Sequence, residues 1–186
     1  MRLPPPLVDL LARRTIRGLM ADAVITSDHP DRTAEKVARL ITADLKTEDD
    51  ITEEARRILM DHQAAIKNQD VEYHHLLAKV KAEVAAKRGY MLSSGPGKIS
   101  REKVMELGRQ VTAMLLEDDD VEYFVKDEAF RNAVVRALER EVARDAQREE
   151  QARQKVRNIK RRIPEESAEF QTLYLQFYRE LLDREG

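Results

Sequence analysis

The chain contains no cysteine and no tryptophan, and glycine and proline occur only six times each among its 186 residues. Without cysteine, the chain cannot supply a disulfide, a zinc–thiolate site or a thiol nucleophile. So little glycine and proline argues against a turn-rich all-β protein. No apolar run approaches the roughly 18 residues that a membrane-spanning helix needs. The start, MRLPPPLVDLLARRTIRG, also lacks the apolar core of a signal peptide. We therefore expect a cytoplasmic protein without membrane contact.

The chain also lacks a large excess of either positive or negative charge. Charged residues make up 37% of the chain, but they nearly cancel to a net charge of −2. This balance excludes a protein that is basic overall, as many nucleic-acid-binding proteins are, and it excludes an acidic tail. Hydrophobic residues, at 42%, are enough for a folded core, whereas aromatic residues are only 5%. The composition therefore predicts a folded, helical and strongly solvated protein.

An apolar pattern near the C-terminus recurs 97 residues earlier in the chain. Five residues there follow the spacing of one helix face: Phe170, Leu173, Tyr174, Phe177 and Leu181. The residues 97 positions before them are also large and apolar: Tyr73, Leu76, Leu77, Val80 and Val84. Because no converging polar groups accompany these stripes, they indicate core packing rather than a cofactor site.

Further helical stripes match at the same offset of 97, and before about residue 24 the offset becomes 96, as in Val8 and Val104. We interpret the register change as one residue gained or lost in the turn after the first helix, where an insertion is tolerated. The sequence therefore predicts an all-α fold of two tandem copies in a pseudo-two-fold arrangement. The copies span residues 1–90 and 98–186, and residues 91–97 read as a linker.

Each copy is expected to hold about four helices. The first helices start after the prolines of LPPP and at Ser100, which is a good N-cap. The others are expected at roughly 31–46, 53–67 and 70–88, and at roughly 127–145, 148–162 and 166–184. Thr47 and Thr52 are predicted to separate two helices of the first copy. The second copy lacks such a break, so its matching helices could be continuous as far as Pro164, and Ser167 could cap the last helix.

The end of the chain, RRIPEESAEFQTLYLQFYRELLDREG, resembles the C-terminal signature of a bacterial family, domain of unknown function five hundred and seven. ISREKVMELGRQVTAML, with the following acidic turn and Val121-Glu122-Tyr123, resembles the start of that family. The matching C-terminal positions are Arg161, Arg162, Pro164, Glu165, Ser167, Glu169, Phe170, Leu173, Tyr174, Phe177, Tyr178 and Gly186.

The resemblance covers the second copy and extends to the first only through the repeat, where Lys67, Asp70 and Lys81 depart from the pattern. We therefore interpret the chain as a tandem duplication whose second copy is the closer match. The resemblance implies a helical fold and a bacterial source, and it implies no activity.

Residues that could bind a metal do not form a metal-site pattern. Glu72 and His75 have the Glu-x-x-His spacing of di-iron bundles, but the second copy has Thr172 where the second histidine should be. The acidic turn at 117–120 lacks the glycine and the alternating ligands of a calcium loop. No glycine-rich phosphate loop or nucleophile–base spacing is present. We predict no catalytic residue, metal or cofactor.

A cationic segment, RQKVRNIKRR, breaks the symmetry between the copies. One interpretation is a solvated helix face paired with Glu149, Glu150 and neighbouring acids. The other is a contact with an anion, either a phosphate backbone or an acidic protein. Interleaved aromatics that could stack on bases are missing. The candidate contact residues are Arg153, Arg157, Lys160, Arg161 and Arg162.

The matching helix of the first copy is apolar where the second copy is cationic. The residues concerned are Ile58, Met60, Ala64 and Ala65. A helix that is apolar on more than one face packs on more than one side, so we expect this surface to contact the other copy or a partner. If it contacts the other copy, Met60→Glu should destabilise the fold by about 2–3 kcal/mol.

These observations predict a non-enzymatic protein that acts through protein–protein interaction, either as a monomer with pseudo-dimeric form or as a homodimer. The alternative hypothesis is association with nucleic acid or the ribosome through the cationic helix 153–162. An enzyme is the third hypothesis, and a deep pocket lined by ionisable groups would favour it.

Overall fold

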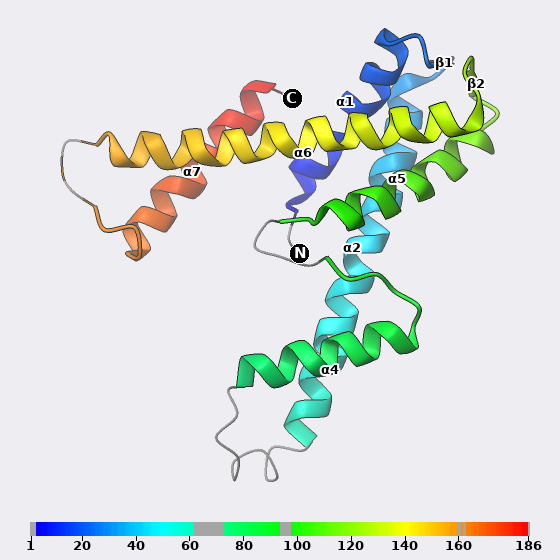
Figure 1. The fold of residues 1–186 in the computed structure, drawn as a ribbon. Coiled ribbons are helices and arrows are strands. Elements are labelled where there is room, and N and C mark those ends of the chain that lie inside the picture. Colours follow the sequence, from blue (N-terminus) through cyan, green and yellow to red (C-terminus); the bar gives the residue numbers. More distant parts are fainter. Residues whose placement is uncertain (1–2, 62–72, 94–97, 160, 162, 186) are drawn as a thin grey trace.

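The computed structural model describes residues 3–61, 73–93, 98–159, 161 and 163–185, which are mostly helical, as the sequence predicts. The described residues form six helices and two short strands (Figure 1). Their order along the chain is α1 (Pro5–Ala21), β1 (Ile25–Ser27), α2 (Pro30–Asp61), α4 (Tyr73–Lys87), α5 (Arg101–Leu116), β2 (Val121–Tyr123), α6 (Asp127–Arg157) and α7 (Ala168–Glu185).

The starts of α5 and α7 agree with the predicted caps, whereas α1 begins at Pro5, within the prolines and not after them. Pro5 and Pro6 occupy the first turn of α1, where a missing N–H leaves no hydrogen bond unmade. The Ser100 hydroxyl accepts a hydrogen bond from the Lys103 N–H at 3.3 Å and caps α5. The Ser167 hydroxyl accepts one from the Phe170 N–H at 3.1 Å and caps α7.

The predicted break between the second and third helices of the first half is wrong, because α2 runs without interruption through Thr47 and Thr52. Both hydroxyls donate back to carbonyls one turn earlier, at 3.0 Å to Ala43 and at 2.9 Å to Glu48. Threonine satisfied in this way continues a helix. The same two segments of the second half are also one helix, α6. The described residues therefore contain six helices rather than eight.

Helix α6 ends earlier than predicted. Its last residue is Arg157, and Asn158 is the C-cap. Pro164 therefore lies well beyond the helix and does not end it. The Pro164 carbonyl instead accepts hydrogen bonds from the N–H of Ser167 at 3.0 Å and from its hydroxyl at 2.6 Å, which forms the turn that precedes α7.

Sequence analysis missed the two strands. They pair in antiparallel fashion, with Ile25 opposite Tyr123, Thr26 opposite Glu122 and Ser27 opposite Val121. Each strand has only three residues, which is too short for an alternating pattern to stand out. The small sheet joins the two halves of the chain at one end of the molecule (Figure 1).

One hydrophobic core is shared by both halves. Side chains from α1, α2, α5 and α6 fill it, and Ile16, Val37, Val111 and Phe130 are fully buried. The apolar stripe of α7 packs against this core, since Tyr174, Phe177 and Leu181 are half-buried there. This confirms the core-packing interpretation of the C-terminal stripe.

A second, smaller core lies between α2 and α4. Ile51, Val84 and Ala85 are its buried members, and Ile58 and Val80 pack against them. Figure 1 shows that α4 and the C-terminal part of α2 extend away from the rest of the molecule. We call α4 together with residues 51–61 of α2 the arm.

Candidate functional site

Charged side chains are buried where α6 meets α7. Asp145 of α6 accepts hydrogen bonds from the Lys98 ammonium at 2.7 Å and from the Tyr178 hydroxyl at 2.6 Å. The Arg148 guanidinium lies 3.4 Å from the same carboxylate. Asp145 and Arg148 are only 5% and 2% exposed. Because an unpaired charge at such depth is strongly unfavourable, these contacts must form together for the helices to pack.

Arg148 extends this network to the end of α7 and to α1. It donates to Glu185 Oε2 from Nη2 at 2.8 Å and from Nε at 3.0 Å. Arg14 of α1 reaches the same oxygen at 2.8 Å and donates to the Glu185 backbone carbonyl at 3.1 Å. The hydrogen bond from Arg148 holds the pKa of Glu185 below its ordinary value, and Arg14 adds to the effect. We call Arg14, Arg148 and Glu185 the latch, because they fasten the last turn of α7 to α1 and α6.

Two tyrosines of α7 complete the network. Burial raises the pKa of Tyr178 well above its ordinary value, and the hydrogen bond to Asp145 raises it further. Burial, together with the neighbouring charge of Glu149, raises the pKa of Tyr174 to about 12. Both phenols are therefore protonated at neutral pH, and they act as hydrogen-bond donors to carboxylates of α6.

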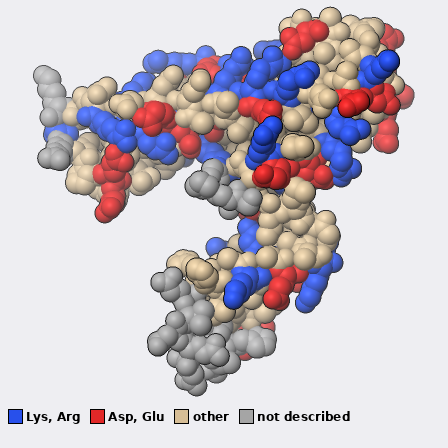
Figure 2. Space-filling model, viewed as in Figure 1, with Lys and Arg blue, Asp and Glu red and all other residues tan. Residues whose placement is uncertain are grey.

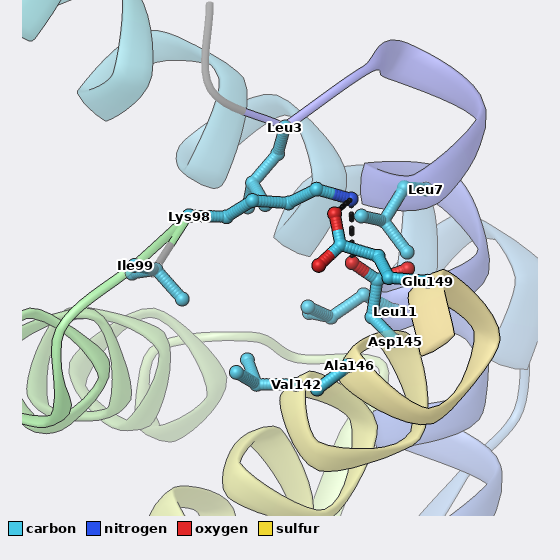
Figure 3. A pocket seen from close by; sticks show the side chains of 9 residues that line it. All are labelled: Leu3, Leu7, Leu11, Lys98, Ile99, Val142, Asp145, Ala146 and Glu149. Atoms are coloured by element: carbon cyan, nitrogen blue, oxygen red, sulfur yellow. Dashed lines mark hydrogen bonds and ion pairs between the residues drawn. The ribbon is translucent and has the colours of Figure 1, made fainter. Parts of the chain in front are cut away.

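A cavity of about 120 Å³ lies beside the network, between α1 and α6 (Figure 3). Its walls are mostly aliphatic, and one side is polar. The lining residues are Leu3, Leu7, Leu11, Lys98, Ile99, Val142, Asp145, Ala146 and Glu149. Figure 3 shows the Lys98 ammonium pointing at Asp145 and Glu149.

The ionisable groups that line the cavity are held by opposite charges. The Lys98 ammonium contacts Asp145 at 2.7 Å, Glu149 at 3.1 Å and the Tyr178 hydroxyl at 2.9 Å. These three contacts match its three hydrogens. A lysine fixed in this way is a cross-link between the segment before α5 and α6, and it is poorly placed to act as a nucleophile or a base.

A second buried network ties α5 to α2 at the base of the arm. The Lys103 ammonium, 1% exposed, lies 2.7–2.8 Å from both carboxylate oxygens of Asp44. It also donates to the Met91 carbonyl at 3.0 Å and sits 3.9 Å from the centre of the Tyr90 ring. The Tyr90 hydroxyl donates to Asp44 at 2.9 Å. Part of the predicted linker is thus held firmly between the halves.

The cationic segment predicted to contact an anion is paired within the chain where the structure describes it. Arg153 lies over the Tyr174 ring and 3.9 Å from Glu149. Arg157 contacts Glu165 at 2.8 Å and Glu150 at 3.3 Å, and the bond to Glu165 raises the pKa of Arg157. Arg161 pairs with Glu169. The other two predicted contacts, Lys160 and Arg162, lie outside the described residues.

The apolar surface predicted on the matching helix divides into two parts. Ile58 packs against the small core of the arm, on the side of α4. Met60 is 68% exposed. Ala64 and Ala65, like His62, lie outside the described residues. The halves meet elsewhere, through α1 on α6, through α5 on α2 and through the sheet.

The described residues contain no group of three metal-binding side chains. In the acidic turn, the Lys36 ammonium contacts Asp118 and lies 3.2 Å from Asp120. His74 and His75 are exposed on α4, and His29 is exposed before α2. None of the described helices has an apolar stretch long enough to cross a bilayer.

Lys98, Lys103, Asp145 and Arg148 were not singled out by sequence analysis. In the long helices a signal did exist, because Asp145 and Arg148 fall on the face that carries Leu138 and Ala152. A charge at a core position of an amphipathic helix indicates a buried partner. The sequence could not show which distant residue would supply it.

Comparison with curated proteins gives no match to this sequence. Comparison with protein families gives a match over residues 1–186, to the family described as protein of unknown function (DUF507). This match includes both halves, whereas the resemblance visible in the sequence lay in the second half. The chain therefore belongs to the DUF507 family.

Proposed function

We propose that this protein is non-enzymatic and acts by binding another protein through its arm. The observation that carries the proposal is Met60, a large apolar side chain that is 68% exposed near the end of α2. Tyr73, at the start of α4, is 47% exposed. Exposed methionine and tyrosine side chains are common anchors in protein interfaces.

The packing of the arm supports this proposal. Among the described residues, its core cluster has three buried members, far fewer than the main core, and α4 makes its main helix contact with α2. An element with few buried contacts opens and adapts more easily than the main core does. A partner that covered Met60 would bury an apolar side chain that the described part of the chain leaves exposed.

We also propose that the two halves are a tandem duplication. At an offset of 96, seven buried positions of α1 coincide with all seven buried positions of α5, among them Leu7 with Lys103 and Leu19 with Leu115. At an offset of 97, eight buried positions of α2 coincide with buried positions of α6, among them Asp44 with Glu141 and Glu48 with Asp145.

The strand register supports the same symmetry. In an antiparallel pair, a local two-fold axis passes between directly opposed residues, because the two strands run in opposite directions. Thr26 lies opposite Glu122, and these two residues are 96 positions apart. An axis between them would relate β1 to β2. The residue gained or lost between the halves would then fall after the strands, at 28–32 and 124–129, and not directly after the first helix.

A photo-crosslinking amino acid at position 60 would test the binding proposal. Full-length protein with the crosslinker should capture a defined partner in cells. Met60→Glu should reduce the amount of that partner that co-purifies by at least tenfold. Since Met60 is exposed, Met60→Glu should leave the melting temperature unchanged, in contrast to the destabilisation expected for a buried position.

Met105 provides the matched control, because it is 54% exposed on α5, away from the arm. Met105→Glu should retain the partner. Equal loss in both variants, or crosslinks that form only between copies of this chain, would contradict the proposal. The second outcome would point to a homodimer, which sedimentation analysis would confirm.

A further inference from the structure

An arginine-rich surface lies where α1 crosses α6, at a place that sequence analysis did not consider. Figure 2 shows basic side chains gathered over the middle of α6. We call this surface the arginine strip, and it consists of Arg13, Arg14 and Arg17 of α1 with Arg136, Arg140 and Arg144 of α6.

Contacts near the crossing of the two helices bring Arg14, Arg140 and Arg144 of the strip close together. Arg14 and Arg144 both pair with Glu141. Arg140 lies 2.9 Å from Asp22, which follows the last residue of α1, and lines a shallow hollow with Arg136. From Arg136 to Arg144 the strip extends about 12 Å along α6, at 1.5 Å per residue.

The strip carries more positive charge than its neighbours neutralise. Its carboxylate partners among the described residues are Asp22, Glu141 and Glu185. Arg13, Arg17 and Arg136 are exposed and form no ion pair with a described carboxylate. Even the paired Arg140 and Arg144 keep about half of their side-chain surface exposed, at 51% and 53%.

The corresponding positions of the other half lack this feature. Each strip residue of α1 has a counterpart 96 positions later, and each strip residue of α6 has one 97 positions earlier. Only two of these six counterparts are arginines. The six are Arg109, Gln110, Ala113, Arg39, Ala43 and Thr47. Arg109 is neutralised by Glu106, at 2.7 Å. Core packing is therefore satisfied without arginine at most of these positions, and a charge surplus on one face needs another explanation.

We propose that the arginine strip binds the phosphate backbone of a nucleic-acid duplex. Guanidinium groups bind phosphate in a bidentate manner, and the strip contains only arginine. The large hydrophobic residues that are exposed in the described chain lie outside α1 and outside residues 136–144 of α6. The strip therefore offers no aromatic ring to stack on bases and no apolar side chain to enter a bilayer. It binds the backbone, independently of sequence.

The test is fluorescence anisotropy of full-length protein with DNA and RNA duplexes of about two helical turns. Between about 50 and 200 mM salt, log K should fall with a slope near −4. The triple variant Arg13→Glu/Arg17→Glu/Arg136→Glu should bind at least tenfold more weakly and flatten the slope by about 3, or about one for each phosphate contact. Its melting temperature should not change, because these side chains make no described ion pair.

The matched control is Arg57→Glu/Lys79→Glu/Lys87→Glu on the arm, which changes the net charge equally at exposed residues. It should keep the affinity of the wild type. The proposal is overturned if neither duplex binds near 50 mM salt, if both variants lose affinity equally, or if anionic phospholipid vesicles bind and duplexes do not. A preference for DNA over RNA would identify which duplex geometry the strip fits.

Discussion

The last helices of the two halves, α4 and α7, occupy corresponding places in the chain but are held very differently. Helix α7 lies on the main core, and the latch fastens its last turn to both α1 and α6. Among the described elements, α4 packs mainly on α2, and Arg88, which directly follows α4, pairs with Glu54 of α2. Both helices form ion pairs with buried partners, since Lys81 of α4 lies 2.9 Å from Glu48 of α2. The latch, however, ties α7 to two helices, whereas the described ion pairs at α4 lead to α2.

The latch residues have different counterparts in the first half. Under the proposed duplication, with its offsets of 96 and 97, the latch residues Arg148, Glu185 and Arg14 correspond to Ile51, Arg88 and Gln110. None of these three can reproduce the network, because the carboxylate is replaced by a cation and the buried guanidinium by an aliphatic chain. The latch links the end of α7 to two helices of the main core, and each of its pairs is stable only when both partners are in place.

The largest effect is expected at the base of the arm. Lys103→Leu leaves the Asp44 carboxylate buried without its cation and should lower the free energy of unfolding by about 3–5 kcal/mol. Chemical denaturation measures this change. Under the proposed duplication, the counterpart of Lys103 is Leu7, which is buried in α1.

The double variant Asp44→Leu/Lys103→Leu tests the cause. It removes both charges, and Tyr90 keeps its hydrogen bond to the backbone carbonyl of residue 44. We expect it to recover most of the lost stability. A double variant as unstable as Lys103→Leu would mean that packing, and not the unpaired charge, sets the cost.

A smaller effect is expected when the latch is removed. Arg148→Ile gives the second half the residue that the first half has at position 51, and should cost about 2–3 kcal/mol. Hydrogen exchange at the end of α7 should rise to the rate seen in α4. If exchange in α7 stays slow, the apolar stripe alone holds the helix.

The close approach of α5 to α6 gives the next prediction. A Cβ at Gly108 would lie 2.5 Å from Val135 Cγ2. Gly108→Ala should therefore destabilise the protein by about 1–3 kcal/mol in spite of the better helix propensity of alanine. At Gly18 a Cβ would meet only Arg140, at 3.6 Å, so Gly18→Ala should be neutral or slightly stabilising in the same thermal melts. Equal effects at the two sites would contradict the packing argument.

The smallest effect is expected when the pH is lowered. Arg148 holds the pKa of Glu185 below its ordinary value of 4.5, so this contribution to stability is complete above pH 4.5 and is lost as the pH falls through the lowered pKa. Hydrogen exchange below pH 4.5, corrected for the intrinsic rate, should therefore increase at the end of α7. Glu185→Gln should remove this pH dependence. An unchanged profile in Glu185→Gln would show that other carboxylates cause the acid response.

Much of the fold could be predicted from the sequence because it depends on local chemistry. Helix faces follow from apolar spacing, which is why the stripe of Tyr174, Phe177 and Leu181 packs on the core as expected. Helix starts at Ser100 and Ser167 follow from side chains that cap the nearest N–H groups. Both signals lie within a few residues of the structure that they determine.

The tertiary structure alone decided the rest. Helix α2 continues through Thr47 and Thr52 because its neighbouring residues Ile51 and Ala55 are fully buried. This packing outweighs the weak preference of threonine against a helix interior. Strand pairing and the arginine strip join residues that lie about 100 positions or more apart in the sequence. The latch joins Arg14 to Glu185 over a similar or greater separation, and Arg148 to Glu185 on a different helix. A sequence pattern shows which residues need a partner, but the identity of that partner depends on how the helices cross.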